Sequence, residues 1–436
     1  MNYIEAMNYL SKAEVFGIKL GLERTERILQ LLDNPHKKIK TIHIAGTNGK
    51  GSTTAMVSNI LIEAGYNVGM YTSPYIEEFE ERIQVNHKFI PKESLAKIIT
   101  DISKVSEIVK EEGYGNPTYF EIVTCAAFLY FYRETVDFAV MEVGMGGRLD
   151  STNVINPLVS AITSISYDHM QILGDTLDKI AMEKAGIIKD KTPVVLYPQE
   201  ELAQEVIEKI CEEKYAPLTM IKQEDVKFLK ISKENEKIRQ LIEVNTVSNS
   251  YTISLNLLGT HQLLNCSLSI NIIEKLQELG YEITREHIEE GLKKVKWNGR
   301  LEIMGTNPMV VVDGAHNIDG IRRLKESVQK YFDYKDIILI LGIVKDKEVY
   351  KMAEMITPMA KKVIAVTAHS DRATSAHELR DVILNYNENC LSMDDYEKAY
   401  NEAVNSAHKD DLILISGSLY MISDMRKVIK KSHNNI

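Results

Sequence analysis

Residues 42–52 read Ile42-His43-Ile44-Ala45-Gly46-Thr47-Asn48-Gly49-Lys50-Gly51-Ser52. Apolar and β-branched residues lead into this stretch, and a helical pattern follows it, so the sequence predicts a strand, a glycine-rich loop and a helix. This arrangement points backbone N–H groups and a helix N-terminus toward an anion. The glycines let the backbone approach a phosphate closely, the lysine adds a point charge, and the serine hydroxyl suits a metal bound between phosphates. We therefore expect a site for a nucleoside triphosphate and magnesium.

The spacing within this loop differs from the common P-loop pattern of Gly, four residues and then Gly-Lys-Ser/Thr. Gly46 stands only three residues before Gly49, and Gly51 separates Lys50 from Ser52. The alternative is a flexible surface turn that contains these residue types by chance. The strand before the loop and the helix after it favour phosphate binding.

Composition sets broad limits on the class of protein. The chain has 436 residues, of which 44% are hydrophobic and 26% charged, which indicates a globular protein of two or three domains. A net charge of -10 argues against a general nucleic-acid surface. The four cysteines are far apart in the sequence, so we expect buried apolar residues, not a disulfide framework or a zinc site. Because no apolar run is long enough for a membrane span and the N-terminus has no basic region, we expect a cytoplasmic protein without a membrane partner.

Strand and helix patterns alternate along most of the chain, which predicts an α/β fold whose mostly parallel sheet has helices on both faces. The strands expected before residue 200 are 40–45, 68–71, 136–143, 158–165 and 193–196. The charged stretch 77–88 is expected to be a loop over the site, and residues 200–258 are less regular, with possible edge strands. The helical pattern breaks at Trp297, and the α/β alternation restarts near residue 309. We therefore predict a domain over residues 1–296 and a smaller C-terminal α/β domain over residues 297–436.

Polar side chains follow several of the expected strands at their carboxyl ends, where ligands bind in open α/β sheets. Ser73 follows the second strand, Glu142 lies near the end of the third, and His169 follows the fourth. A carboxylate, a hydroxyl and one imidazole suit magnesium or manganese. Taken singly, Glu142 also fits a salt-bridge partner and His169 a structural histidine. Their shared position favours a metal site.

The second α/β region and the helices between the strands offer further candidates, each with an ordinary alternative. Asp313-Gly314-Ala315-His316-Asn317 follows a strand and precedes a helix, as in a common Asp/Gly turn with an Asn cap. Arg300 fits a phosphate contact or a solvated surface charge. Lys184 fits a cation placed favourably at a helix end. Gly417-Ser418 begins another strand-to-helix turn.

Several stretches together resemble one family, the folylpolyglutamate synthases and bifunctional dihydrofolate synthases of the Mur ligase superfamily. They are Gly46 to Ser52, Thr72-Ser73-Pro74, Gly144 to Asn153, Ser166-Tyr167-Asp168-His169, Glu183-Lys184-Ala185-Gly186-Ile187, Asn298-Gly299-Arg300-Leu301-Glu302, Asp313 to Asn317 and Ser416-Gly417-Ser418-Leu419-Tyr420. Each stretch alone is a weak signal, but they run in order over nearly the whole chain, and together they are highly specific. The unusual spacing of the glycine loop is also the one that this superfamily uses.

The resemblance implies an ATP-dependent ligase that adds L-glutamate to the γ-carboxyl group of a folate, with ATP as co-substrate and Mg²⁺ as the metal. Residues 1–296 would then be an ATP-binding central domain and residues 297–436 a ligase domain. For the nucleotide, the resemblance implies that the triphosphate is held by Thr47, Asn48, Gly49, Lys50, Gly51 and Ser52, and that further contacts come from Asn265, Arg300 and Asp313. For the metals, it implies that magnesium is held by Ser73, Glu142 and His169, and that Lys184 is carbamylated and supports a second metal. For the other substrates, it implies a pterin and substrate surface at Arg82, Phe120 and Glu121, with His316 and Ser418 near the glutamate. Lys50, Lys184 and His316 are the catalytic candidates.

Two other functions remain open at this stage. A UDP-muramyl amino acid ligase would share the nucleotide core, although the glycine loop begins near residue 46 and leaves no obvious room for an extra N-terminal UDP-binding domain. A nucleotide-binding switch without ligation would have no need of Glu142, His169 and Lys184. Dihydropteroate is a further possible substrate. We expect a monomer with small-molecule substrates only.

Overall fold

The structure is a computed structural model that describes residues 1–17, 19–234, 237–345, 347–370 and 373–434. The chain forms two compact units. The first contains residues 1–230, 241–255 and 263–295, and the second contains residues 231–240, 256–262 and 296–436. The second unit thus includes two short segments that precede residue 296, where the sequence predicts a boundary.

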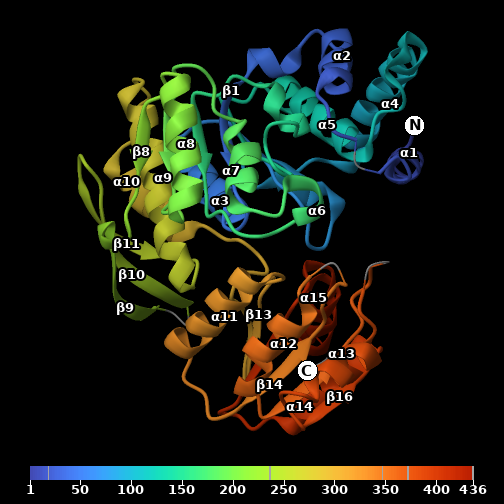
Figure 1. Cartoon of the computed structure of the whole chain (residues 1–436), viewed down its shortest axis with the longest axis vertical. Helices are drawn as coiled ribbons and strands as arrows, with labels where there is room; N and C mark the ends of the chain where they lie inside the picture. Colours follow the sequence, from blue (N-terminus) through green and yellow to red (C-terminus); the bar gives the residue numbers. More distant parts are fainter. Residues whose placement is uncertain (18, 235–236, 346, 371–372, 435–436) are drawn as a thin grey trace. The chain divides into compact units, whose positions relative to one another are not determined.

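An eight-stranded sheet in the order β4-β3-β2-β5-β1-β6-β7-β8 forms the centre of the first unit within the described residues. The strands from β2 to β8 in this order pair parallel with one another, whereas β3 pairs antiparallel with β2 at the edge, and helices cover both faces (Figure 1). The strands are β1 Lys40–Ala45, β2 Val68–Tyr71, β3 Ile83–Val85, β4 Lys88–Phe89, β5 Phe138–Glu142, β6 Val159–Ile162, β7 Val194–Leu196 and β8 Leu218–Met220.

The helices of the first unit are α1 Tyr3–Glu14, α2 Glu23–Leu31, α3 Lys50–Glu63, α4 Lys92–Val109, α5 Tyr119–Arg133, α6 Met170–Leu173, α7 Leu177–Ala185, α8 Glu201–Glu213, most of α9 Thr260–Glu278, and α10 Arg285–Lys294. Helices α1, α2, α4 and α5 share one apolar core with side chains of β2 and β5, whereas α7 and α8 pack on β6 and β7. Capping boxes begin α1 at Asn2 and α5 at Thr118, which satisfies N–H groups that have no partner within the helix.

The second unit is built on a six-stranded sheet in the order β12-β13-β17-β14-β15-β16, counted over the described residues. All its strand pairs are parallel except β12 with β13. Its elements are β12 Glu302–Thr306, β13 Met309–Val312, α11 Ile318–Tyr331, β14 Ile337–Leu341, α12 Val349–Ile356, β15 Lys362–Ala365, α13 Ala376–Ile383, β16 Cys390–Ser392, α14 Tyr396–Ser406, β17 Leu412–Ser416 and α15 Leu419–Asn434. A separate three-stranded sheet consists of β9 Val226–Glu234, β10 Lys237–Asn245 and β11 Ser250–Leu255.

The predicted fold class is therefore confirmed, and two local predictions need correction. Residues 77–88 are not only a loop: a 3₁₀ turn at Phe79–Arg82 leads into β3 and β4, which extend the sheet edge as an antiparallel hairpin. Asn86 and His87 both have positive φ, as a tight hairpin turn requires. The fourth strand ends at Ile162, earlier than predicted, because Ser164 and Ser166 beyond it bond to the glycine loop.

Two compositional predictions can also be compared with the structure. All four cysteines are buried and free, as expected. No helix in the described part of the chain is both long enough and apolar enough to cross a membrane.

Candidate active site

The loop between β1 and α3 has glycine where its backbone and its neighbours require it. Gly46 has a φ of 145° and Gly49, the residue before α3, has a φ of 95°. A Cβ atom on Gly49 would lie 2.6 Å from Oδ1 of Asn265, a buried residue of α9. Side chains are therefore excluded here by both conformation and space. The structure thus brings Asn265, a predicted nucleotide contact, directly against the predicted phosphate loop.

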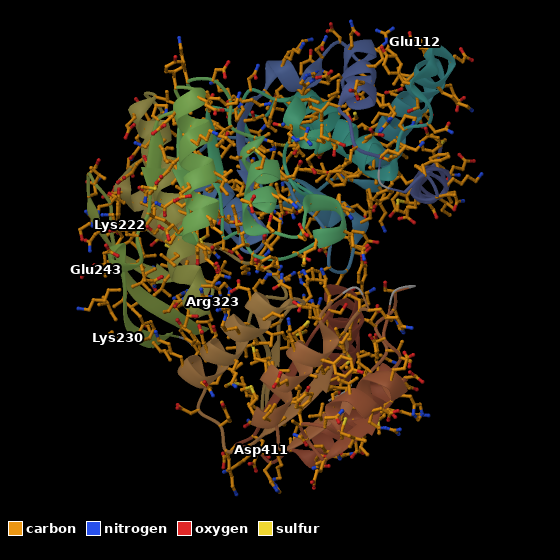
Figure 2. The ribbon with its side chains drawn as sticks, in the orientation of Figure 1. Glu112, Lys222, Lys230, Glu243, Arg323 and Asp411 are labelled. Atoms are coloured by element: carbon orange, nitrogen blue, oxygen red, sulfur yellow. The ribbon has the colours of Figure 1, made fainter. Side chains whose placement is uncertain are left out.

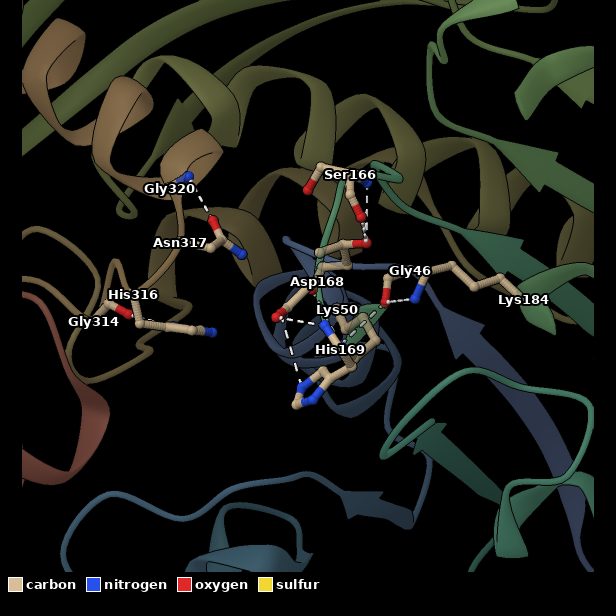
Figure 3. Close-up of polar contacts among 11 residues, drawn as sticks. Gly46, Lys50, Ser166, Asp168, His169, Lys184, Gly314, His316, Asn317 and Gly320 are labelled. Carbon is tan, nitrogen blue, oxygen red and sulfur yellow. Dashed lines mark hydrogen bonds and ion pairs between the residues drawn. The ribbon is translucent and has the colours of Figure 1, made fainter. Parts of the chain in front are cut away.

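Two lysine side chains meet at one carbonyl group of this loop (Figure 3). Lys50 Nζ donates to the carbonyl oxygens of Gly46 and Thr47, both at 3.2 Å, and Lys184 Nζ donates to the Gly46 oxygen at 2.8 Å. Lys184 stands in the last turn of α7, but its side chain is 3% exposed and not solvated. The pKa of Lys184 is lowered to about 7, mainly because the amine is buried and secondly because the charge of Lys50 is close. A substantial part of Lys184 is therefore an uncharged amine at neutral pH.

Ser73 and Glu142, two of the three predicted metal ligands, are neighbours in the structure. The backbone N–H of Ser73, just after β2, donates to Glu142 Oε2 at the end of β5 over 3.0 Å. Glu142 is 4% exposed, so this carboxylate is held inside the carboxyl edge of the sheet. Carboxylate and hydroxyl oxygens are hard ligands that suit Mg²⁺. The pair therefore fits the predicted metal by its chemistry.

His169 and the residue before it form the polar end of the loop after β6. His169 has a φ of 50° and precedes α6, and its N–H donates to Asp168 Oδ1 at 3.0 Å (Figure 3). Its Nε2 lies 3.9 Å from Asp168 Oδ2. Asp168 also acts electrostatically on Lys184. Asp168 was not among the residues predicted for the site, although its position beside His169 in the Ser-Tyr-Asp-His stretch is a usable signal.

A buried hydrogen-bond network that the sequence analysis missed supports the glycine-rich loop after β5. Asp150 Oδ2 accepts from the N–H groups of Gly144 and Met145, each at 3.0 Å, and Oδ1 accepts from the Thr152 hydroxyl at 2.5 Å. The Thr152 oxygen is 2.8 Å from Nε2 of His43 on β1. Because the hydroxyl proton goes to Asp150, His43 is the donor through Nε2. Burial lowers the pKa of His43 to about 3, so this imidazole is neutral.

The predicted substrate residues lie together but are engaged differently. Arg82 is buried between aromatic rings, with its guanidinium carbon 5.1 Å from the Tyr75 ring centre and 5.7 Å from that of Tyr119. Phe120 packs on Gly144, where a Cβ atom would collide with its ring. Glu121 accepts hydrogen bonds from the Thr118 N–H at 2.7 Å and from Arg24 Nε at 2.9 Å. Both Glu121 carboxylate oxygens thus accept hydrogen bonds from other residues of the protein, which favours a structural role for Glu121. Arg82 and Phe120 are therefore the better candidates for contact with a substrate.

The buried Arg24–Glu121 pair predicts a large loss of stability on mutation. We expect Arg24→Ala to lower the free energy of unfolding by about 3 kcal/mol, because it leaves the Glu121 carboxylate, 2% exposed, without its counter-charge. Arg27→Ala is the matched control, since its partner Glu112 lies at the outer surface (Figure 2), both side chains are partly exposed, and the pair should contribute less than about 1 kcal/mol. Urea unfolding measures both variants. Equal losses in the two variants would contradict this interpretation.

In the second unit, the predicted residues gather at the carboxyl ends of the adjacent strands β13 and β17. Asp313 is buried and accepts from the N–H groups of Leu301 at 2.9 Å and Ala315 at 2.8 Å. Burial raises the pKa of Asp313 above its usual value, and the nearby Arg300 guanidinium offsets only part of this rise. His316 Nδ1 is 2.9 Å from the Gly314 carbonyl oxygen, so this contact makes Nδ1 the donor (Figure 3). Ser418 is buried just after β17, where the Gly417 N–H donates to the Ala315 oxygen.

Comparisons with known proteins give the family. The Mur ligase middle domain matches residues 44–273, and the Mur ligase glutamate ligase domain matches residues 299–419. The dihydrofolate synthase/folylpolyglutamate synthase of Bacillus subtilis (strain 168) is 38% identical over 431 residues, covering 98% of this chain and 99% of the relative. The chain belongs to the folylpolyglutamate synthase family of Mur ligases.

Solved structures of this family share the fold over the full length. The folylpolyglutamate synthase of Thermotoga maritima is 34% identical, covers 99% of this chain and 97% of its own, and superposes with a TM-score of 0.84. The Mycobacterium tuberculosis enzyme complexed with ADP and AMPPCP is 27% identical, with coverages of 98% and 99% and a TM-score of 0.89. The family resemblance seen in the sequence is thus confirmed, and the chain is an ATP-dependent, amide-forming ligase.

Proposed function

We propose that this folylpolyglutamate synthase family member joins L-glutamate to the γ-carboxyl group of tetrahydrofolate and its polyglutamates through an acyl phosphate. The observation that carries the proposal is the phosphate loop itself, where Lys50 and Lys184 both reach the carbonyl oxygen of Gly46. The Lys50 ammonium group places a cation at the glycine loop, which suits a site where negative charge moves between phosphate oxygens. A protein that only binds nucleotide would not require the second, buried lysine.

The chemistry explains why a phosphoryl group must be transferred first. A carboxylate resists attack by an amine because of its own negative charge. One of its oxygens attacks the γ-phosphorus of ATP, the bond from that phosphorus to the β–γ bridging oxygen breaks, and ADP leaves. The glutamate nitrogen then attacks the acyl carbon, phosphate leaves, and the nitrogen loses a proton. Lys50 would hold the transferring group in line, and exclusion of water would protect the acyl phosphate.

Ser73, Glu142 and His169 are the residues that we propose for magnesium. Bound Mg²⁺ would neutralise charge on the phosphate oxygens. Glu142 supplies the anionic oxygen, and the hydrogen bond from the Ser73 N–H to this carboxylate fixes its orientation. Asp168 holds the backbone of His169 and adds negative charge beside the loop.

The remaining roles are proposals of the same kind. Residues 47–52 and Asn265 would contact the triphosphate in an ATP-binding domain over residues 1–296. Arg300 and Asp313 would contact the nucleotide from a ligase domain over residues 297–436. Arg82 and Phe120 would contact the folate, with Glu121 beneath them, and His316 and Ser418 would lie near the glutamate. We also propose a cytoplasmic monomer without nucleic-acid or membrane partners.

Lys184 is proposed to carry a carbamate. Its neutral amine attacks carbon dioxide, which forms an N–C bond and releases one proton. Since the pKa of Lys184 is lowered to about 7, the reactive fraction increases as pH rises from 6 to 8. We expect ¹³C-labelled bicarbonate to give a protein carbamate resonance that grows over this pH range in the wild type. The Lys184→Met variant should lack the resonance, and the control Lys179→Met, at an exposed ion pair, should retain it. A wild-type spectrum without the resonance at pH 8 would contradict the proposal.

The test of the function is a product assay with tetrahydrofolate and dihydropteroate in parallel. Each reaction contains ATP, magnesium and L-glutamate, and mass spectrometry identifies the products. The proposal expects glutamylated tetrahydrofolate together with ADP. Product from dihydropteroate as well would add a dihydrofolate synthase activity. ADP release driven only by a UDP-muramyl substrate would indicate the cell-wall ligase, and no ADP release with any acceptor would indicate a nucleotide switch.

A further inference from the structure

The glycine loop and the segment after β6 are bonded to each other over several residues. The Thr47 N–H donates to the Ser164 oxygen at 2.7 Å, and the Ser164 hydroxyl donates to the Asn48 oxygen at 3.2 Å. The Thr47 hydroxyl donates to the Ser166 oxygen and accepts from the Ser166 N–H, both at 3.1 Å. Asn48 and Ser164 form an antiparallel bridge. The conformation of the loop at Thr47 and Asn48 therefore depends on where residues 164–166 lie.

The other side of this segment is held by one side chain, that of Gln199. Gln199 Nε2 donates to the Thr163 oxygen at 2.8 Å, and Gln199 Oε1 accepts from the Ile165 N–H at 2.9 Å. The carbonyl can only accept and the N–H can only donate, so these two partners fix the orientation of the amide. Gln199 is half-buried and lies between Pro198 and Glu200, the residue that precedes α8.

The two contacts of Gln199 reproduce the bonding of a neighbouring strand. In a parallel ladder a residue bonds, through its N–H and its C=O, to the two residues that flank its partner. The Gln199 amide does this to the residues on either side of Ser164. The backbone ladder between β6 and β7 ends with the Tyr197 N–H donating to the Ile162 oxygen at 2.9 Å, and the side chain continues it by one step. Ser164 is thus paired with the glycine loop on one side and with the Gln199 amide on the other.

We propose that Gln199 is a positioning residue for the nucleotide: its amide holds residues 163–165 in place against the glycine loop and so fixes the conformation of that loop at Thr47 and Asn48 for nucleotide binding. This inference rests on the proposed function. The same segment leads, three residues after Ser166, to the proposed metal ligand His169. Without the amide, the Thr163 carbonyl and the Ile165 N–H lose their partners and the segment can move away from the loop.

The test compares two variants with a matched control by calorimetry of Mg-ADP binding and by steady-state kinetics. Gln199→Met keeps the length of the side chain without its polar atoms, and we expect the Kd for Mg-ADP and the KM for ATP to rise about tenfold. Gln199→Asn keeps the amide but is one methylene shorter, so it can reach one partner only, and we expect a rise of about threefold. Gln204→Met on α8 is the control, because Gln204 Nε2 donates only within its own helix, to Glu208 at 2.8 Å. It should match the wild type.

The kinetic pattern separates positioning from general damage. We expect the KM values for folate and glutamate to stay within about twofold of the wild type in both Gln199 variants, because their contacts lie elsewhere. Unchanged affinity for Mg-ADP in a folded Gln199→Met variant would overturn the role of Gln199 but not the proposed function. An equal rise in the KM values for all three substrates would do the same. If Gln199→Met does not fold, the Gln199→Asn variant is the test. A rise of about threefold in its Kd for Mg-ADP supports the inference, and a Kd equal to that of the wild type overturns it. A wild type that does not bind Mg-ADP would overturn the proposed function as well.

Discussion

Replacing Lys50 by alanine should lower kcat/KM for ATP-dependent ligation by about 10³-fold or more and leave the fold intact. Lys50 is the first residue of α3, and its ammonium group donates to two carbonyl oxygens of the glycine loop. A cation placed where charge develops on a transferring phosphoryl group contributes on this scale. The initial rate of ADP formation with folate and glutamate present measures the effect.

Two controls keep this prediction falsifiable. Lys179→Ala removes an exposed lysine that pairs with Asp175 at 2.7 Å, and it should retain full activity. Thermal unfolding of the Lys50 variant should match the wild type, since the lysine contributes only hydrogen bonds to two loop carbonyls. Near-normal turnover of a folded Lys50→Ala protein would rule out phosphoryl transfer at this loop.

The second large effect is expected at Glu142. Glu142→Gln removes the negative charge but keeps an oxygen that can accept from the Ser73 N–H, so the local structure should persist. We expect kcat to fall about 10²-fold and the magnesium concentration for half-maximal rate to rise at least about tenfold, because a neutral amide is a much weaker ligand for a hard cation. Magnesium titration of the ADP-forming rate measures both quantities.

Glu183→Gln is the matched control for Glu142. Glu183 pairs with the exposed Arg148 at 2.8 Å on the surface of α7, beside the same glycine-rich loop. Its removal should leave the magnesium dependence unchanged. A Glu142→Gln enzyme whose magnesium curve superposes on that of the wild type would exclude Glu142 as a metal ligand.

The strands and the glycine loop after β1 could be predicted because their signals are local. The expected bounds of β1 and β2 agree with the structure, since short apolar runs bounded by turn residues indicate a buried strand. The turn and helix after β1 followed from the glycine-rich stretch and the helical pattern after it. The hairpin at residues 83–89 was missed because its charged flank resembles a surface loop, while the two positive-φ residues that make its turn, Asn86 and His87, give only a weak signal.

The environment of each site residue was harder to predict, because the burial of a side chain and its hydrogen-bond partners depend on the tertiary fold. The sequence places Lys184 at a helix end, where a solvated cation is ordinary, and only the fold shows its ammonium group buried against Gly46. Gln199 lies in an unremarkable Pro-Gln-Glu stretch, yet its amide reaches across to Thr163 and Ile165. For Glu121, the family resemblance implies a place at the pterin and substrate surface, and the structure adds that both its carboxylate oxygens accept hydrogen bonds from within the protein.

The most direct test of the account follows labelled oxygen from the folate to phosphate. Tetrahydrofolate carrying ¹⁸O in its γ-carboxyl group is incubated with the enzyme, ATP, magnesium and L-glutamate, and the phosphate products are examined by mass spectrometry. Attack of the carboxylate on the γ-phosphorus, followed by loss of phosphate, must transfer one ¹⁸O atom to inorganic phosphate for each amide formed. Unlabelled inorganic phosphate, or ¹⁸O found in AMP, would show that the carboxylate is not activated by γ-phosphoryl transfer at this loop.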